Sequence, residues 1–378
     1  MAQRSRSKQG YRRIVAKLGT NLLMAGTDKL DARLMSSLVA QIVRLIGEGR
    51  EVIVVTSGAI AAGRERLDEH GHRRDIPFRQ VLAAVGQAHL MHTYDKLFAA
   101  HGRVVGQTLL TRRDLADRGS YLNARNTLLG LLDLGVVPVI NENDAVATDE
   151  IAGAKIGDND NLSALVANLI DADLLALLTD TGGLYSADPR TNKGAAVIPR
   201  IDRITKEIES IAGGSESGRG TGGMATKLQA ARLATGHGSD VFIADGRERD
   251  VLYRLANGEH IGTMFPARTS RMESRKRWMV SGLATKGCII VDAGAAKALI
   301  ERHKSLLPAG VREVQGVFKR GDGVSICLPD NSPIACGITN YGAEELAIIG
   351  GMRSDRIEAA LGYQYGSEVV HRNNLVVL

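Results

Sequence analysis

Short apolar runs alternate with longer segments of helical spacing between residues 12 and 265. The apolar runs predict buried strands at 14–19, 51–59, 104–110, 136–140, 173–180 and 239–246. The segments of helical spacing predict helices at 34–49, 78–100, 122–134, 160–171 and 224–236. Strands this apolar are buried on both faces, which favours a largely parallel sheet covered by helices. The pattern therefore predicts an α/β fold, a three-layer αβα sandwich with a mainly parallel sheet.

The alternation stops near residue 266, where Pro266 and a cation run at 268–280 begin a different kind of sequence. Short apolar segments follow, with a Gly-Asp-Gly turn signal at 321–323. They predict a second, small β-rich domain. We expect a basic, disordered tail at 1–10, an α/β domain at 11–267, a linker at 268–282 and the β-rich domain at 283–365.

Composition excludes some classes of protein. Of 378 residues, 44% are hydrophobic and 24% are charged, a balance that excludes a wholly disordered chain. No stretch approaches the roughly 18 apolar residues of a membrane helix, so no membrane partner is expected. The basic start lacks a following apolar segment and is therefore not read as a secretory signal.

The net charge of +6 suggests nucleic-acid binding, but the positions of the charged residues along the chain do not support it. Five cations lie in residues 1–13, and five more lie in residues 268–280. From residue 281 onward, ten cations balance ten anions. Phosphate-backbone binding needs clustered cations, and aromatic residues for base stacking make up only 4% of the chain. Nucleic acid is therefore not the expected partner.

Three cysteines, Cys288, Cys327 and Cys336, all lie in the last quarter of the chain. Their number is odd and no CxxC pair occurs, so we do not expect a disulfide scaffold. We expect a cytoplasmic location instead. Cys327 and Cys336 face each other only if a hairpin joins them. We interpret them instead as two buried small hydrophobic residues.

Two candidate sites follow the first two predicted strands. Lys17-Leu18-Gly19-Thr20 places a lysine before a tight turn, although a solvated lysine gives the same pattern. Thr56-Ser57-Gly58 leads from a strand into a helix, where backbone N–H groups bind carboxylate or phosphate. A simple capped turn is the alternative for this second segment.

Two further segments are rich in residues that bind polar ligands. The stretch from Asn141 to Asn161 carries many Asn and Asp residues around Lys155 and Gly157, but it does not fit the calcium-binding EF-hand pattern. Residues 218–227 form a glycine loop that leads into a helix, with Lys227 one turn inside it. Such a loop offers bare amides, a helix dipole and a cation to a phosphate. A flexible surface loop is the alternative.

Taken together, these segments offer two lysines for phosphoryl transfer but no obvious general base. A hydroxyl acceptor must lose a proton during transfer, so its kinase usually supplies an Asp or His base. A carboxylate acceptor is already ionised at neutral pH. The set therefore favours phosphorylation of a carboxylate, which needs only alignment and charge neutralisation.

The same motifs resemble those of the amino acid kinase family. The resemblance covers residues 12 to 372 and is closest to the members that phosphorylate the side-chain carboxylate of L-glutamate, giving L-glutamyl 5-phosphate in the first step of proline biosynthesis. The C-terminal segment resembles the PUA module, which is attached to many bacterial enzymes of this kind. The resemblance to the amino acid kinase family rests on the motifs at 17–20, 54–63, 141–147, 155–167, 177–190 and 220–231.

The resemblance implies a role for each motif. Lys17 and Lys227 contact the transferring phosphoryl group, and Asp160 holds the two lysines. Ser57, Asp144 and Asn159 bind glutamate, with Asp144 at its α-amino group. The nucleotide partner is ATP, carrying Mg²⁺ on its phosphates, and residues 183–190 border the purine. The implied nucleotide-binding residues are Lys17, Thr179, Asp180, Thr221, Gly222, Gly223, Met224, Ala225, Thr226 and Lys227.

The resemblance also implies proline as a feedback inhibitor and a homo-oligomer, a dimer or tetramer. One departure from the family pattern is a longer loop with Ala152-Gly153-Ala154 inserted on the acceptor side. The alternatives are another amino acid kinase, acting on N-acetylglutamate or aspartate, and an RNA-binding role through the PUA-like domain. Only the acceptor loops distinguish the first alternative from a kinase that acts on glutamate. The balanced charge after residue 281 argues against the second alternative.

Overall fold

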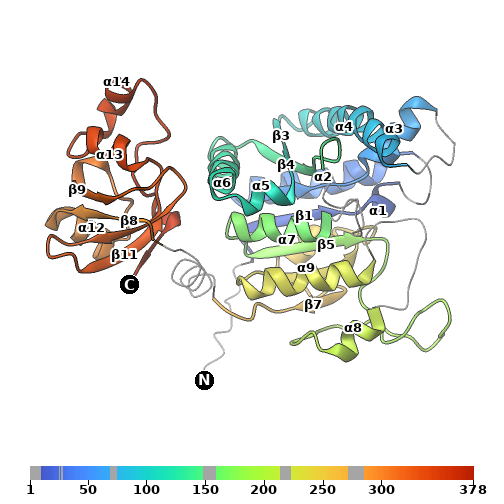
Figure 1. The fold of residues 1–378 in the computed structure, drawn as a ribbon. Helices are drawn as coiled ribbons and strands as arrows, with labels where there is room; N and C mark the ends of the chain where they lie inside the picture. The colour runs from blue at the N-terminus through green and yellow to red at the C-terminus, as the bar shows by residue number, and fades with distance from the viewer. Residues whose placement is uncertain are drawn as a thin grey trace. The chain divides into compact units, whose positions relative to one another are not determined.

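The chain divides into two compact units (Figure 1). One unit contains the residues up to 115 and residues 124–270, and the other contains residues 116–123 and the C-terminal part of the chain. The computed structural model describes residues 10–24, 26, 29–68, 75–147, 159–212, 223–270 and 285–378.

A seven-stranded sheet forms the centre of the first unit, in the order β3-β4-β2-β1-β5-β6-β7. Every neighbouring pair is parallel except β6 and β7, which are antiparallel. The six expected strands are confirmed, and the short edge strand β7 was not expected. The strands are β1 (Arg13–Leu18), β2 (Glu51–Val55), β3 (Val105–Leu110), β4 (Val137–Glu142), β5 (Leu174–Thr179), β6 (Asp240–Asp245) and β7 (Thr263–Phe265).

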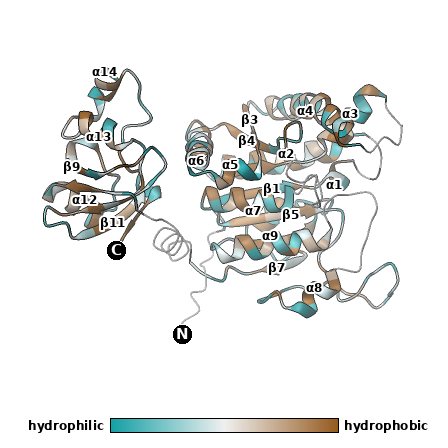
Figure 2. Cartoon of the chain, viewed as in Figure 1, coloured by the Kyte–Doolittle hydropathy of each residue, from teal (hydrophilic) through white to brown (hydrophobic). Residues whose placement is uncertain are grey.

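Helices cover this sheet, as the alternating pattern predicted. Strand β5 is coloured mainly as hydrophobic, whereas helices such as α9 mix hydrophobic and hydrophilic residues (Figure 2). The helices are α1 (Thr20–Met24), α2 (Ala32–Gly47), α3 (Ala59–Leu67), α4 (Ile76–Ala99), α5 (Arg112–Ala116), α6 (Arg118–Asp133), α7 (Asn159–Leu169), α8 (Lys206–Ala212), α9 (Met224–Gly236) and α10 (Val251–Ala256). None of the described helices is both long and apolar enough to cross a membrane.

The two faces of β1 pack against different layers. Ile14, Ala16 and Leu18 belong to one core cluster, together with apolar residues of α2, α4 and α10. Side chains alternate along a strand, so Val15 and Lys17 lie on the opposite face. Helix α7 contacts β1 and β5, and it packs against α9. The pleat of β1 therefore presents Lys17 to the layer that contains α7.

Glycines bring α3 and α4 unusually close. A Cβ atom on Gly86 of α4 would lie 1.8 Å from the carbonyl oxygen of Ala59, the first residue of α3. A Cβ atom on Gly63 of α3 would lie 2.0 Å from the carbonyl oxygen of Leu82. Only glycine fits at these two contacts. The pair fixes the turn before α3, which carries Ser57.

The second unit contains a five-stranded sheet in the order β12-β11-β10-β8-β9. The small β-rich architecture was expected, whereas a parallel β8–β10 pair was not. Strand β12 pairs with β11, so this sheet includes residues beyond 365. The strands are β8 (Gly287–Val291), β9 (Val311–Gly316), β10 (Gly323–Cys327), β11 (Pro333–Ile338) and β12 (Leu375–Val377), with helices α12 (Ala293–Arg302), α13 (Ala343–Ile349) and α14 (Ile357–Leu361).

Cys327 and Cys336 are both buried, as interpreted, but the expectation that the cysteines form no disulfide is wrong. Cys288 and Cys327 form a disulfide, and Cys336 is not part of it. The β10–β11 hairpin places Cys336 opposite Ser325 rather than Cys327. Parallel pairing of β8 with β10 brings residues 288 and 327 together, and no local spacing in the sequence reveals that pairing.

Candidate active site

Lys17 lies near the carboxyl end of β1, between the parallel neighbours β2 and β5. The chain builds outward from β1 on one side through β2, and later on the other side through β5. In open α/β sheets, such a reversal of strand order marks the ligand site at the carboxyl ends of the strands. The strand order therefore places Lys17 between two parts of the sheet, with β2 and β4, where the acceptor is predicted, on one side and β5 and β6 on the other.

Asp160 brings the two predicted lysines together. Its Oδ1 lies 2.5 Å from Lys17 Nζ, and its Oδ2 lies 3.3 Å from Lys227 Nζ. Thr226 donates its hydroxyl hydrogen to Oδ2 at 2.8 Å. Asp160 is 1% exposed, and the lysines are 6% and 7% exposed. The sequence separates these residues widely, and the fold makes them one buried charged cluster.

The charge state of Asp160 follows from its surroundings. Burial alone would raise its pKa, but the charges of Lys17 and Lys227 oppose that effect. Hydrogen bonds from Lys17 and Thr226 lower the pKa further, and the net result is a pKa well below the ordinary value. Asp160 is therefore an anion at neutral pH. With its pKa lowered and its two oxygens engaged by the two lysines, this carboxylate is poorly suited to act as a general base.

Hydrogen bonds near Asp160 fix the first turns of α7 and α9 relative to each other. Asp160 lies in the first turn of α7, where a carboxylate is stabilised by the helix dipole. The Ser163 hydroxyl donates to the Asp160 carbonyl oxygen at 2.6 Å. Asn161 Nδ2 donates to Gln229 Oε1 on α9 at 2.9 Å. The link from α7 to α9 fixes Lys227, two residues before Gln229, at the cluster.

A cavity of about 370 Å³ opens beside the cluster on the β5 side. It is lined by the predicted nucleotide-binding residues Thr179, Asp180, Gly223, Met224 and Lys227, together with residues from the predicted purine border at 183–190. Lys17, Ala225 and Thr226 were also predicted, but they are not among its lining residues. Thr221 and Gly222 lie outside the described residues, as do Lys155, Gly157 and the insertion at 152–154.

Sequence reasoning missed four lining residues of this cavity, and one of them, Thr181, directly follows the predicted Asp180. Asn21 follows the first motif directly, and its Nδ2 donates to Asp180 Oδ2 at 3.3 Å. Its position directly after the Lys17–Thr20 motif could have indicated that Asn21 belongs to the site. Ile211 and Ala212 end the short helix α8, whose polar sequence gave no indication that it borders a cavity.

The predicted acceptor side lies at the ends of β2 and β4. Ser57 donates its hydroxyl hydrogen to the Leu18 carbonyl oxygen at 2.8 Å, which ties the β2 turn to the end of β1. Gly58 follows with a φ of 97°, a conformation that favours glycine. The predicted residue Asp144 is half-buried in the turn after β4. Asn159, also predicted, is buried at the start of α7.

Helix α4 contacts the ends of β2 and β4, the two strands of the predicted acceptor side. Asn141 Nδ2 donates to Gln87 Oε1 at 2.8 Å, and the Tyr94 and Thr56 hydroxyl oxygens lie 2.8 Å apart. Burial raises the pKa of Tyr94, so its phenol stays neutral. Neither Gln87 nor Tyr94 was predicted, because an amide and a phenol on a helix look like ordinary packing residues.

Two profiles of known protein families match this chain. A profile described as "Amino acid kinase family" matches residues 12–245, and one described as "PUA domain" matches residues 287–361. The chain belongs to the amino acid kinase family. The expected fold class, an amino acid kinase fold with a C-terminal PUA domain, is therefore confirmed.

Several relatives of this amino acid kinase are named "Glutamate 5-kinase". The one from Dehalococcoides mccartyi (strain CBDB1) is 53% identical over 97% of this chain and 99% of its own length. The one from Herpetosiphon aurantiacus is 52% identical over 97% and 98%. The one from Deinococcus radiodurans is 50% identical over 97% and 100%. Likeness at this level along nearly the whole chain confirms the resemblance inferred from the motifs.

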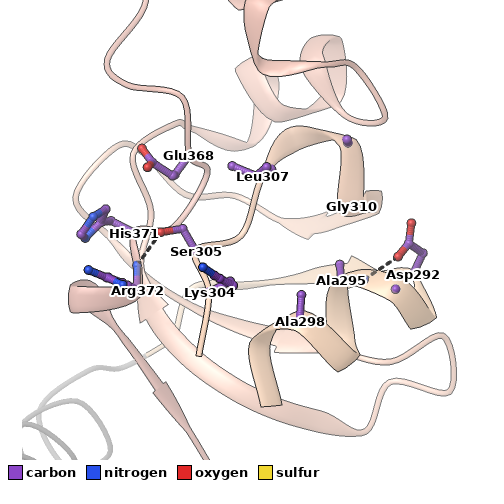
Figure 3. A pocket seen from close by; sticks show the side chains of 12 residues that line it. Asp292, Ala295, Ala298, Lys304, Ser305, Leu307, Gly310, Glu368, His371 and Arg372 are labelled. Atoms are coloured by element: carbon purple, nitrogen blue, oxygen red, sulfur yellow. Dashed lines mark hydrogen bonds between the residues drawn. The ribbon is translucent and has the colours of Figure 1, made fainter. Parts of the chain in front are cut away.

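The PUA domain of this amino acid kinase contains a cavity of its own, of about 670 Å³ (Figure 3). Lys304, Ser305 and Arg372 lie on one side of it, where the Arg372 backbone N–H donates to Ser305 Oγ at 3.0 Å. Neither Lys304 nor Arg372 forms an ion pair within the described residues. None of the predicted catalytic or binding residues lines this cavity.

Proposed function

We propose that the protein phosphorylates the side-chain carboxylate of L-glutamate with ATP, giving L-glutamyl 5-phosphate for proline biosynthesis. It is a phosphotransferase with a carboxyl group as acceptor. The single observation that carries this proposal is the pair of lysines held on Asp160 between the β2 and β5 sides of the sheet. The names of the relatives support glutamate as the acceptor.

The reaction balances without a protein base. An oxygen of the ionised side-chain carboxylate forms a bond to the γ-phosphorus, the bond from that phosphorus to the bridging oxygen breaks, and ADP leaves. No proton has to move before the transfer. Charge spreads over the transferring group as the bond breaks, and Lys17 and Lys227 stabilise it there. Asp160 keeps both ammonium groups in place before the nucleotide binds.

The remaining roles follow from position. Thr179, Asp180, Gly223 and Met224 line the cavity on the β5 side, which we assign to ATP. Thr221, Gly222, Ala225 and Thr226 stay predicted nucleotide-binding residues. On the opposite side of β1, Ser57, Asp144 and Asn159 are assigned to glutamate, with Asp144 at the α-amino group.

Magnesium is assigned to ATP rather than to a protein cage. Among the described residues, no three His, Cys, Asp or Glu side chains come together as ligands for an ion. Asp160, the buried carboxylate of the cluster, is already occupied by two lysines. Mg²⁺ keeps several waters and takes few protein ligands when it binds with phosphates. We therefore derive no step of the protein's own residues through the ion.

Three finer predictions stay with this function. Proline shares the α-carboxylate and an α-amino group with glutamate, so it fits the same acceptor side as a feedback inhibitor. Assembly as a homo-oligomer and a cytoplasmic location also remain predictions.

The test is acceptor choice. The protein is incubated with Mg²⁺-ATP and L-glutamate, N-acetyl-L-glutamate or L-aspartate, and hydroxylamine traps the acyl phosphate as a coloured hydroxamate. We expect hydroxamate chiefly from glutamate. Full activity with N-acetylglutamate and none with glutamate would contradict the proposal and identify a different amino acid kinase.

A further inference from the structure

The side-chain amide of Gln87, on α4, is hydrogen-bonded through its oxygen but not through its nitrogen. Its Oε1 accepts a hydrogen bond from Asn141 Nδ2 at 2.8 Å. Its Nε2 is buried and has no hydrogen-bond partner among the described residues. A buried N–H group without a partner costs folding free energy, and native proteins keep few of them. The unbonded amide therefore indicates a ligand that completes it.

The position of this amide is defined by β4. Asn141 is the residue before the last of β4, and the turn that carries Asp144 follows directly. Asn141 is 1% exposed, and its Oδ1 accepts the backbone N–H of Glu142 at 2.9 Å. Both ends of the Asn141 amide are thus engaged, which holds Gln87 at the carboxyl end of the strand.

Close contacts hold α4 in place and thereby fix the position of the Gln87 amide. Gly86, the neighbour of Gln87, lies against the carbonyl oxygen of Ala59 at the start of α3. Two turns further along, Tyr94 bonds to Thr56 at the end of β2. The helix is therefore fixed to the ends of both acceptor strands, and Gln87 sits on a rigid support.

A glutamate acceptor needs such a donor. Besides the carboxylate that reacts, it presents an ammonium group and an α-carboxylate to the protein. Asp144 suits the ammonium group. Ser57 already donates its hydroxyl hydrogen to Leu18, so it has no second hydrogen for the α-carboxylate. An amide Nε2 carries two hydrogens, and both of those on Gln87 are available.

We propose that Gln87 binds the α-carboxylate of the acceptor amino acid and makes the enzyme selective for acceptors in which that group is ionised. The inference rests on the proposed function, because it names a contact to the same acceptor. Gln87 orients the amino acid through N–H···O bonds, while its Oε1 keeps Asn141 in place. It takes no part in the phosphoryl transfer itself.

The test uses the full-length chain with the substitutions Gln87→Glu and Gln87→Leu. Gln87→Glu keeps an oxygen for Asn141 but replaces the donor by a negative charge that repels the α-carboxylate. We expect the KM for glutamate to rise roughly 10- to 100-fold with kcat within a few-fold of wild type. Gln80→Leu, two turns earlier on α4, is the matched control and is expected to leave both constants unchanged. Circular dichroism and thermal unfolding establish that each variant is folded.

A second acceptor gives a readout that a merely structural role would not move. In the α-amide of glutamate, the α-carboxylate is replaced by a group that itself donates hydrogen bonds. We expect wild type to prefer glutamate over this amide, and Gln87→Glu to lower that preference by at least about tenfold.

The outcomes separate the two proposals. Wild type that makes no hydroxamate from glutamate overturns the proposed function and this inference together. Wild type that phosphorylates glutamate, with an unchanged KM and an unchanged acceptor preference in Gln87→Glu, overturns the inference alone. Loss of kcat with an unchanged KM also overturns it, because the residue would then act only through the position of Asn141.

Discussion

Lys17 Nζ lies 2.5 Å from Asp160 Oδ1, which ties the central strand of the sheet to the first turn of α7. The same carboxylate receives Lys227 from α9. One anion thus sets the place of two cations that come from distant parts of the chain. The two lysines are therefore held in place before any substrate binds, and in the proposed reaction this lowers the reorganisation energy during transfer.

The lysines are expected to act on kcat. Lys17→Ala and Lys227→Ala should each lower kcat by roughly 10²- to 10⁵-fold, because both stabilise charge that develops in the transition state. The KM for glutamate should change far less. Steady-state kinetics measure both constants. Arg232→Ala, which removes an exposed cation from the same helix as Lys227, serves as the control. Near-normal kcat in Lys227→Ala would show that the phosphoryl site is assigned wrongly.

Asp160 is expected to give pH-dependent stability. Asp160→Asn leaves two buried ammonium groups without their anion, and we expect a loss of about 3 kcal/mol at pH 7. The folded-state pKa of Asp160 is depressed, so its contribution is present above the ordinary value of 3.8 and is lost as pH falls below it. Urea unfolding of wild type and variant at pH 7 and pH 3 measures this. A stability difference that stays the same at both pH values would contradict the assignment.

Asp144 is expected to act on binding instead. An ammonium contact has the same strength in the ground state and the transition state, so Asp144→Ala should raise the KM for glutamate with little effect on kcat. A loss of about 1.5–3 kcal/mol corresponds to a rise of roughly 10- to 100-fold. Initial rates at varied glutamate concentration decide between the two effects. Asp133→Ala, at the exposed end of α6, is the control. A lower kcat at unchanged KM would move Asp144 from binding to the chemical step.

The α3–α4 contact is expected to be a sensitive point of the fold. A methyl group on Gly86 would meet the Ala59 carbonyl oxygen at 1.8 Å, so Gly86→Ala should destabilise the protein by about 3 kcal/mol. Gly130 lies within α6 and has open space at its Cβ position. Gly130→Ala should therefore stabilise the protein by about 0.5–1 kcal/mol. Equal unfolding free energies for the two variants, measured in urea, would refute the close packing.

Much of the fold was visible in the sequence because buried parallel strands are continuous apolar runs. The runs at 14–19 and 173–180 became β1 and β5, and the site motifs follow directly from their ends. The relation between Lys17 and Asp160 was different. Composition and spacing predicted two lysines and many acids, but only the resemblance assigned Asp160 to both. The packing of α7 against β1 decides this contact, and such packing leaves no local pattern in the sequence.

The supporting residues were not predictable for a related reason. Gln87 and Tyr94 lie on a helix whose spacing only indicates that one face is buried. Their hydrogen bonds to Asn141 and Thr56 depend on where α4 crosses the strand ends. The Cys288–Cys327 pair likewise depends on a parallel strand contact. Each of these is a property of tertiary packing.

Oxygen-isotope transfer identifies the atom that attacks the γ-phosphorus of ATP. In the proposed reaction, that atom is an oxygen of the side-chain carboxylate of glutamate. Glutamate labelled with ¹⁸O in that carboxylate is phosphorylated in the presence of hydroxylamine, which attacks the acyl carbon and releases phosphate. Mass spectrometry of the phosphate should show one ¹⁸O atom in each molecule released. Unlabelled phosphate, formed as fast as ADP, would mean that water or another group is the acceptor and would rule out transfer to the glutamate carboxylate.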